Sequence, residues 1–572
     1  MDFIKKHTSP ILVAVFVIAA ILMFYAPMYA YQEGLQIFMF NGEFFADTCL
    51  RPGGLSDYIG CFFVQFFMYP HWTALIITAL VVGVQLILKS IFVNNGSDKQ
   101  SADALGVMCA VGMVAAVVNF NVMFGGCVAV LIAVAAAKLA QTSENKILLG
   151  VITPLIYYVT GGWCCLIYIA ALAAKSSSKK EVIFPAINIG LLLFSWLIIK
   201  KLTQDDSLYG TFTGVDFNRY PSKSCPVWFV AISIIIASIA ISKTKLPLGK
   251  IAVRISMCAV AVAVLIFYMS ARYQRGLILD YKIDRMVRYK QWNEIASTME
   301  KQKHTSKNMA QCYLNLALNE LGVTGNKMFN FVQIGTNGLI SSANDTQDKC
   351  ICNSEIYFRL GLINISERLT MEAMEGNNTF QKSARLYKRL AECAILKGQK
   401  ELAMRYLKKL QATIYYRAWA LRAEQYLNDP AHTEAQADWK IKPLTMKQDV
   451  FFKPSTGAHF LYNLVVNNPS NPKTFNYLVS FMMLDKNIGK LYELLSRHHP
   501  DGELGIHIYE ATLLYLYLHK KDEFQKVMTN NNDLTKRFGN FCKFMNSGGA
   551  QNPENAKELF GNTYWFYYYF CN

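Results

Sequence analysis

Charged residues are scarce in this sequence, and so are the motifs of common soluble enzymes. Only 17% of the 572 residues are Asp, Glu, Lys or Arg, whereas 53% are hydrophobic. No Walker loop, dinucleotide fingerprint, H-E-x-x-H zinc motif or nucleophile elbow occurs. Cys350 and Cys352 form a C-x-C pair without a second pair or a histidine pattern nearby. We therefore expect neither a metal site nor a cofactor.

Long hydrophobic runs dominate the first half of the chain. A helix needs about 20 apolar residues to cross a bilayer, and on this basis we predict about nine spans. They lie at 10–31, 71–93, 104–119, 121–141, 147–160, 162–175, 182–200, 227–243 and 251–271. No small-residue cleavage site follows the first run, so we expect a retained span and not a signal peptide.

The composition changes at Arg272 and Tyr273, where polar, helix-patterned sequence begins and continues to the end of the chain. No convincing strand run occurs in this half. We therefore predict an all-α protein. Residues 1–272 form a polytopic transmembrane helix bundle, and residues 273–572 form a soluble helical domain.

The soluble domain contains a candidate repeat. Residues 386–410 predict a helix, a turn at Gly398 and a second helix, with Ala391 and Ala403 at positions of close packing. This segment resembles a tetratricopeptide repeat, and helix pairs also fit 315–331, 474–497 and 507–528. True repeats would stack into a small solenoid whose concave surface holds a peptide or a protein partner. An ordinary helical domain without repeats is the alternative.

The positions of the lysines predict the orientation of the spans. The net charge is +17, which we attribute to membrane topology and not to nucleic-acid binding. With a cytoplasmic N-terminus, most lysines between spans fall inside, and the turns at 119–121 and 161–162 carry none. An odd number of spans then places residues 273–572 in the periplasm of a bacterial inner membrane. Merging one of the short span pairs would reverse this orientation.

Candidate chemistry is concentrated in residues 32–70, called here the first loop, which we expect on the outer side. It contains four carboxylates, Glu33, Glu43, Asp47 and Asp57. It also contains one arginine, Arg51, which directly precedes the Pro52-Gly53-Gly54 turn. Glu43 and Asp47 are four residues apart, so on a helix they share a face. Either could deprotonate a hydroxyl acceptor, while Arg51 could bind a phosphate leaving group. Eight aromatic or aliphatic side chains nearby suit a membrane interface.

Residues Thr203 to Pro226, called here the second loop, are expected on the same side. If this segment folds over the first loop, Arg219 could bind an anionic substrate. A solvated connector is the alternative. Cys49 and Cys61 bracket the turn of the first loop, and an oxidising periplasm would allow them to form a disulfide.

The layout of the first loop and the hydropathy outline resemble GT-C membrane glycosyltransferases, which use polyprenyl-phosphate sugars. In that class a long first outside loop carries an acidic residue, amphipathic helices follow, and several members end in a soluble outside domain. The resemblance implies Glu43 or Asp47 as the catalytic base, with Glu33, Arg51, Asp57 and Arg219 as substrate-binding residues. This chain has no adjacent acidic pair after its first span, so the choice of base stays open.

Three stretches also resemble an uncharacterised family of large bacterial membrane proteins: RPGGLSDYIGCFFVQFFMYP, the N-L-A-L segment at 315–318, and Asn467-Asn468-Pro469. That resemblance implies no activity. The alternative to an enzyme is a non-catalytic membrane scaffold that recruits a periplasmic protein through residues 273–572. In that case the carboxylates cap interfacial helices and Arg51 reaches the lipid headgroups. Transport is disfavoured, because no confident span carries a charge at its midplane.

Overall fold

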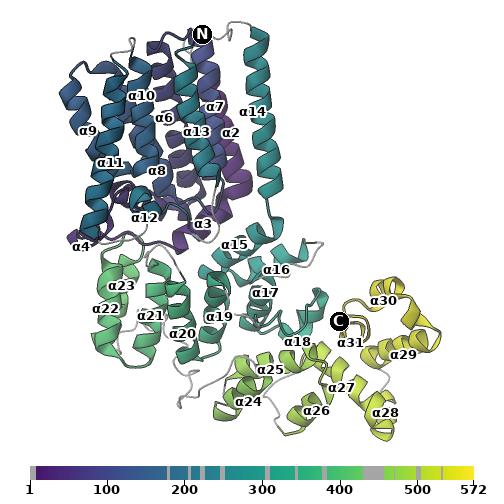
Figure 1. Ribbon diagram of the computed structural model, residues 1–572. Coiled ribbons are helices and arrows are strands. Elements are labelled where there is room, and N and C mark those ends of the chain that lie inside the picture. The colour runs from purple at the N-terminus through teal and green to yellow at the C-terminus, as the bar shows by residue number, and fades with distance from the viewer. Residues whose placement is uncertain are drawn as a thin grey trace. The chain divides into compact units, whose positions relative to one another are not determined.

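A computed structural model describes most of the chain as helices (Figure 1). The residues that it describes are 8–176, 181–203, 208–219, 226–244, 251–302, 309–341, 346–376, 383–428, 457–468, 471–497, 504–529 and 532–571. In these ranges the only extended pairings are two isolated bridges, Val122 with Asn218 and Ile334 with Thr336. The predicted all-α fold class is confirmed. Asp205, Asp206 and Tyr220 of the second loop lie outside the described residues, as do Asn344 and Asp429, around which the sequence has polar linkers.

The chain divides into two compact units. Unit 1 consists of Met1–Ile278, Asn377–Tyr387 and Lys408–Ala420, and unit 2 consists of Leu279–Gly376, Lys388–Leu407 and Leu421–Asn572. Two short segments from the second half of the sequence therefore belong to unit 1. Each unit is described by itself below.

Unit 1 is a bundle of mostly apolar helices. Its helices are α2 (Thr8–Ala20), the π-helix η1 (Ile21–Tyr25), α3 (Ala26–Gly34), α4 (Gly42–Cys49), α5 (Gly54–Val64), the 3₁₀-helix η2 (Gln65–Met68), α6 (Pro70–Asn94), α7 (Lys99–Val117), α8 (Phe124–Thr142), α9 (Lys146–Thr160), α10 (Gly162–Lys175), α11 (Ile183–Thr203), α12 (Leu208–Thr213), α13 (Pro226–Ile241) and α14 (Ile251–Arg272). Pro27 lies in the first turn of α3 and has no backbone N–H to donate. That missing donor accounts for the wide turn of η1 directly before it.

Six of the described helices are long and apolar enough to cross a membrane. They are Thr8–Gly34, Pro70–Asn94, Lys99–Val117, Phe124–Thr142, Ile183–Thr203 and Ala252–Arg272. The other three predicted spans are present as shorter apolar helices, α9, α10 and α13. The turns at 119–121 and 161–162 separate antiparallel helices, so neither short pair merges into one rod.

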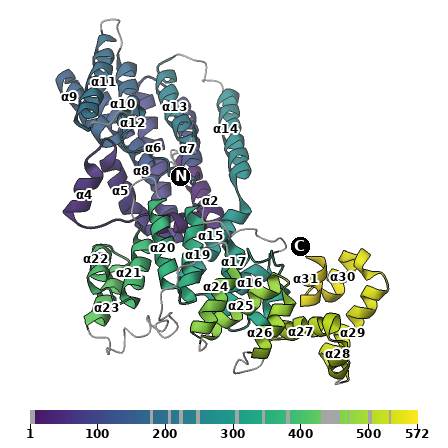
Figure 2. The same ribbon diagram turned by 60° about the horizontal axis from the view of Figure 1, so that its bottom comes forward.

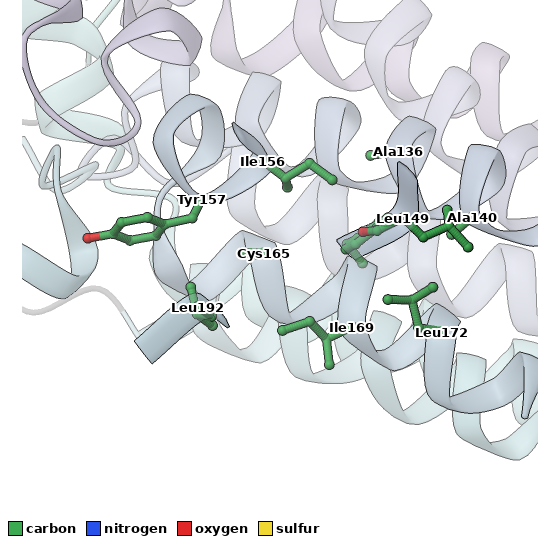
Figure 3. Close-up of a cluster of buried hydrophobic side chains, with 10 residues drawn as sticks. Ala136, Ala140, Leu149, Ile156, Tyr157, Cys165, Ile169, Leu172 and Leu192 are labelled. Atoms are coloured by element: carbon green, nitrogen blue, oxygen red, sulfur yellow. The ribbon is translucent and has the colours of Figure 1, made fainter. Parts of the chain in front are cut away.

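Packing among α8, α9, α10 and α11 shows how the short helices are held. A cluster of buried side chains, among them Leu149, Ile156, Ile169, Leu172 and Leu192, fills the space between them (Figure 3). Polar contacts tie the same helices: the hydroxyl of Tyr168 donates to the carbonyl of Leu149 at 2.8 Å. This cluster accounts for the close packing of helices too short to be obvious spans.

Unit 2 is built of short helices that pair with their neighbours in sequence, for example α19 with α20, α24 with α25, and α26 with α27 (Figures 1 and 2). α15 (Arg275–Arg288) contains the point in the sequence where unit 1 gives way to unit 2, and α21, α22 and α23, whose bounds follow, also have residues in both units. The following helices are α16 (Trp292–Glu300), α17 (Met309–Glu320), α18 (Thr324–Lys327), η3 (Met328–Asn330), α19 (Gln347–Arg359), α20 (Ile363–Glu375), α21 (Ala384–Leu396), α22 (Lys400–Gln411), α23 (Arg417–Asn428), α24 (Gly457–Asn467), α25 (Pro472–Leu484), α26 (Ile488–Arg497), α27 (Ile506–His519), α28 (Lys521–Met528), α29 (Asp533–Asn546), η6 (Gly549–Gln551), α30 (Pro553–Phe560) and α31 (Tyr564–Phe570).

The helix–turn–helix predicted for residues 386–410 is present as α21 and α22. Gly398 forms the turn with a φ of +74°, which favours glycine because it has no Cβ. Ala391 and Ala403 are completely buried, as expected where two helices approach closely. The helix pairs predicted at 474–497 and 507–528 are also present, as α25 with α26 and α27 with α28.

Candidate functional site

The first loop folds into a hairpin of two short helices, α4 and α5. Asn41 caps α4, since its Oδ1 accepts a hydrogen bond from the backbone N of Phe44 at 2.8 Å. The turn between the helices uses Gly53 with a φ of +81°. Gly54 follows it so closely under α4 that an added Cβ would lie 2.1 Å from the carbonyl oxygen of Thr48. The Pro-Gly-Gly sequence thus specifies a tight reversal that a larger side chain would block.

Backbone hydrogen bonds join this hairpin to α9 and to the second loop, and join the second loop to the segment before α8. The N–H of Gly53 donates to the carbonyl of Tyr158 at the end of α9, at 2.8 Å. From the second loop, the N–H of Val215 donates to the carbonyl of Pro52, also at 2.8 Å. Phe217 accepts a bond from the N–H of Met123, just before α8, at 2.8 Å. The second loop therefore lies against the first loop. This contact is the condition under which we expected Arg219 to be able to bind an anionic substrate.

Glycines allow α5 to pack directly on the start of α8. A Cβ added to Gly60 would lie 2.5 Å from the Cα of Gly125, and one added to Gly125 would lie 2.8 Å from Oδ1 of Asp57. Ordinary Cβ contacts are longer than 3.4 Å. The backbones are in direct contact here, and the carboxylate of Asp57 is held against α8.

The structure separates the charged residues of the first loop into two groups. Glu43 and Asp47 lie on α4, four residues apart as predicted, and both are exposed. Glu33 at the end of α3 and Asp57 on α5 are only 5% and 7% exposed. Arg51, at the turn, is partly buried. The two carboxylates that the sequence favoured as bases thus lie at the surface, and the two assigned to substrate binding are inside.

Arg219 is also buried, with 3% of its surface exposed. Its backbone N–H donates to the carbonyl of Asn121 at 2.7 Å, and its Nε donates to the carbonyl of Phe120 at 3.3 Å. The guanidinium carbon lies 5.1 Å from the centre of the Phe120 ring. These contacts hold the second loop onto the turn between α7 and α8.

The charges of Asp57 and Arg219 both affect the pKa of the Cys61 thiol. Burial raises the pKa of this thiol well above the usual value, and the negative charge of Asp57 raises it further. The positive charge of Arg219 lowers the same pKa. Two of the predicted site residues therefore converge within electrostatic reach of one thiol on α5. Cys49 and Cys61 are free thiols and not a disulfide pair.

A small cavity lies beside Cys61, between the end of α3, α5 and the segment 413–416. Its walls include Glu33, Gln36, Cys61 and Gln65, together with Tyr415 and Tyr416. Its volume is about 20 Å³, enough for a single ordered water and too small for a sugar. Among the described residues, Oε1 of Gln36 has no hydrogen-bond partner although it is buried. Glu33 and Gln36 therefore line the same small cavity, and the buried amide oxygen of Gln36 has no protein donor there.

The other wall of the cavity comes from the distant segments of unit 1. The hydroxyl of Ser383 donates to the carbonyl of Gly34 at 2.6 Å, and the N–H of Ala384 donates to the carbonyl of Gln36 at 3.2 Å. The N–H of Phe40 donates to the carbonyl of Ala412 at 2.8 Å. These bonds fix residues 34–40, which follow α3, in an extended path.

Sequence reasoning missed Gln36, Gln65 and the segment 383–416. Gln36 and Gln65 are isolated amides within aromatic and aliphatic runs, LQIFMF and FFVQFF, and that contrast could have identified them. Nothing in the local sequence indicates that residues 412–416 reach the first loop. In the described part of the chain, no three His, Cys, Asp or Glu side chains are grouped as metal ligands would be.

A family model matches residues 3–571 of the chain, and its description is a family of unknown function, DUF6057. The chain belongs to that family, and the predicted likeness to an uncharacterised family is confirmed in this respect. Neither a curated protein nor a solved structure matches it.

Proposed function

We propose that the protein is a multi-pass membrane transferase of the GT-C type, which uses a polyprenyl-phosphate sugar in cell-envelope glycan assembly. The observation that carries the proposal is the buried carboxylate of Glu33. It lies at the end of the first apolar helix, before the amphipathic hairpin α4–α5, and lines a small cavity together with Gln36, whose buried Oε1 has no hydrogen-bond partner among the described residues. An acidic residue followed by amphipathic helices is the arrangement that the GT-C resemblance implies for the first loop.

In this proposal Glu33 takes the role of general base, in preference to Glu43 and Asp47. A base must reach the proton that it removes and must be shielded from competing water. Glu33 is buried beside a cavity, whereas Glu43 and Asp47 are exposed on α4. Gln36 would accept a hydrogen bond from the acceptor substrate. Because the cavity holds only about one water, the acceptor must displace the wall formed by residues 413–416.

Arg51 is the proposed partner of the lipid phosphate, at the turn of the hairpin. Aromatic and aliphatic side chains around it, Phe40, Phe45 and Leu50, are 46–71% exposed and suit the headgroup boundary of a bilayer. Asp57 and Arg219 are proposed to position the hairpin, since both are buried against the ends of other helices.

The test compares charge-neutral variants in a deletion strain. Glu33→Gln, the double variant Glu43→Gln with Asp47→Asn, and the exposed control Glu144→Gln are expressed at equal levels in the membrane fraction. Envelope glycans are then profiled by mass spectrometry. We expect a product that depends on the wild-type protein to disappear only with Glu33→Gln. Loss of the product only with the double variant would instead assign the role of general base to Glu43 or Asp47. A glycan profile that the deletion does not change would refute the proposal that the protein is a transferase.

The proposed location is a bacterial inner membrane, with residues 273–572 in the periplasm. Its support is the set of six helices long and apolar enough to span and the lysine asymmetry of the connections. Reporter fusions after Ser177 and after Ala550 should report opposite sides. The same side for both would overturn this orientation.

The helical hairpins of unit 2 favour a second candidate function, a non-catalytic scaffold. Tyr462 and Val466, one turn apart on α24, are 38% and 50% exposed, as are side chains that bind a partner in a tetratricopeptide-like groove. A photo-crosslinking amino acid at Val466 in the full-length protein should capture one periplasmic protein reproducibly. The same probe at the exposed Leu421 is the control, and equal capture at both positions would contradict a specific surface.

A further inference from the structure

A second hollow of unit 1 is unrelated to the candidate site. An apolar groove of about 530 Å³ runs between α7 and α14, lined by Met108 and by the face of α14 from Ala252 to Ala261. Ser256 contributes the only hydroxyl of the lining. Sites for small molecules are typically about 300–1,000 Å³. The groove thus has the size of a ligand site and an almost entirely hydrocarbon wall.

Polar contacts fix α14 to its neighbours at both ends of this groove. Nη1 of Arg254 lies 3.3 Å from Oδ2 of Asp98, which is the N-cap of α7. Near the opposite end of α14, Nδ2 of Asn119 donates to the hydroxyl of Tyr268 at 2.8 Å. The helices are tied at two levels, and the small side chains of Ala252, Ser256 and Ala261 leave the space between these levels unfilled. The hollow is therefore held open by the fold.

We propose that this groove binds one acyl chain of an anionic phospholipid as a structural ligand. The inference rests on the proposed membrane location but not on transferase activity. Both α7 and α14 are long and apolar enough to cross a bilayer, and an apolar groove between two such helices is filled by hydrocarbon. Only 6% of the most apolar stretch of α14 is buried by other parts of the protein. In this proposal the lipid chain supplies the packing that neighbouring side chains do not.

Charge complementarity selects the headgroup. The lining residues of α14, Ala252 to Ala261, lie in its first half, toward the end of the bundle where α6, α8, α10 and α13 end and where α7, α9 and α14 begin. Among the described residues at that end, basic side chains outnumber acidic ones: Lys89, Lys99, Lys138, Lys146, Lys175, Lys243 and Arg254 against Asp98, Asp103, Glu144 and Glu181. Each basic residue near a membrane surface favours anionic lipids by about 1 kcal/mol. Lys99, exposed at the first position of α7, directly follows Asp98, the ion-pair partner of Arg254 on α14.

The test uses the full-length protein, purified in mild detergent and examined by native mass spectrometry. Ser256→Trp places an indole in the groove, and Ile255→Trp places the same group on the adjacent position, which is 63% exposed and outside the lining. We expect wild type and Ile255→Trp to retain one anionic phospholipid and Ser256→Trp to lose it at least tenfold. If Ser256→Trp does not fold, Ala261→Phe fills the groove with a smaller change and gives the same readout.

Four results would overturn the proposal. Wild-type protein without a bound lipid would show that the groove is not a lipid site. Equal retention by Ser256→Trp and Ile255→Trp would place the lipid elsewhere, and retention of a zwitterionic lipid would refute the headgroup argument. A homodimer abolished by Ser256→Trp would show that a second copy occupies the groove. Failure of the transferase proposal leaves these outcomes unchanged, whereas a protein absent from the membrane fraction refutes the location itself.

Discussion

Replacement of Gly60 by alanine should release the hairpin of the first loop from the helix bundle. The added Cβ would meet the backbone of Gly125 at 2.5 Å from its Cα and 2.6 Å from its N. Backbone atoms cannot rotate away, so α5 or the start of α8 must shift. Overpacking costs about 1–3 kcal/mol, and contacts this short belong at the upper end of that range. Alanine regains about 1 kcal/mol in helix propensity, which leaves a net cost of about 2 kcal/mol.

Cys61 reports that release, because it lies one residue away and is 4% exposed in the closed hairpin. A net cost of about 2 kcal/mol raises the population of the opened hairpin by about 30-fold. Alkylation of Cys61 by N-ethylmaleimide should accelerate by the same factor when opening and closing are fast. Burial and Asp57 raise the pKa of this thiol, so the closed form holds little thiolate and the wild-type rate should still be rising above pH 9.

Peptide mass spectrometry separates Cys61 from the partly exposed Cys49, which serves as an internal reference. Gly83→Ala is the matched control, since its nearest atom is a Leu131 side-chain carbon at 3.7 Å and no acceleration is expected. Gly125→Ala presses on Asp57 from the other side and should accelerate alkylation like Gly60→Ala. A rate at Cys61 unchanged by both variants would refute the close packing on which the site is built.

The remaining predictions concern unit 2 and are measured by thermal unfolding of the purified protein. Arg389→Met removes one of the two arginines paired with the largely buried Glu355 and leaves Arg359 in place, so it should cost about 1–3 kcal/mol; an unchanged stability would contradict the pairing. Glu510→Ala removes the acceptor of the amide at the start of α31 and should cost about 1–3 kcal/mol, with faster hydrogen exchange of that amide. Gly398→Ala strains a turn with φ of +74° in open space and should cost about 1–2 kcal/mol, whereas Gly489→Ala within α26 should cost nothing.

The helices themselves were predictable, because their signal is local. Each predicted span coincides with an apolar helix to within a few residues, since length and hydropathy need no knowledge of distant contacts. The turn at Gly398 was identified for the same reason, as a glycine between two amphipathic helices. Both kinds of prediction depend on residues that are neighbours in sequence.

The division of charges in the first loop was not predictable, because burial depends on what packs against each residue. Glu43 and Asp47 share a helix face as predicted, but that face meets no other part of the described chain closely enough to bury them. Asp57 is buried because Gly125 and the second loop cover it, and Glu33 because α5 and residues 413–416 do. Those partners are about 20 to 380 positions away in sequence, beyond the reach of a helical or strand period.

The burial of Glu33 and Gln36 is also the reason for assigning a chemical role to this cavity. An amide oxygen buried without a donor costs about 1–3 kcal/mol, and an apolar residue in place of Gln36 would avoid that cost. An ordered water can satisfy the oxygen in a cavity of this size, and a substrate hydroxyl that displaces the water can make the same hydrogen bond. That hydroxyl would then lie beside the carboxylate of Glu33, which is the group able to remove its proton. A purely structural role explains the burial of Asp57 and Arg219, whose neighbours they hold together, whereas the chemical role of Gln36 and Glu33 belongs to the proposal and is tested by Glu33→Gln.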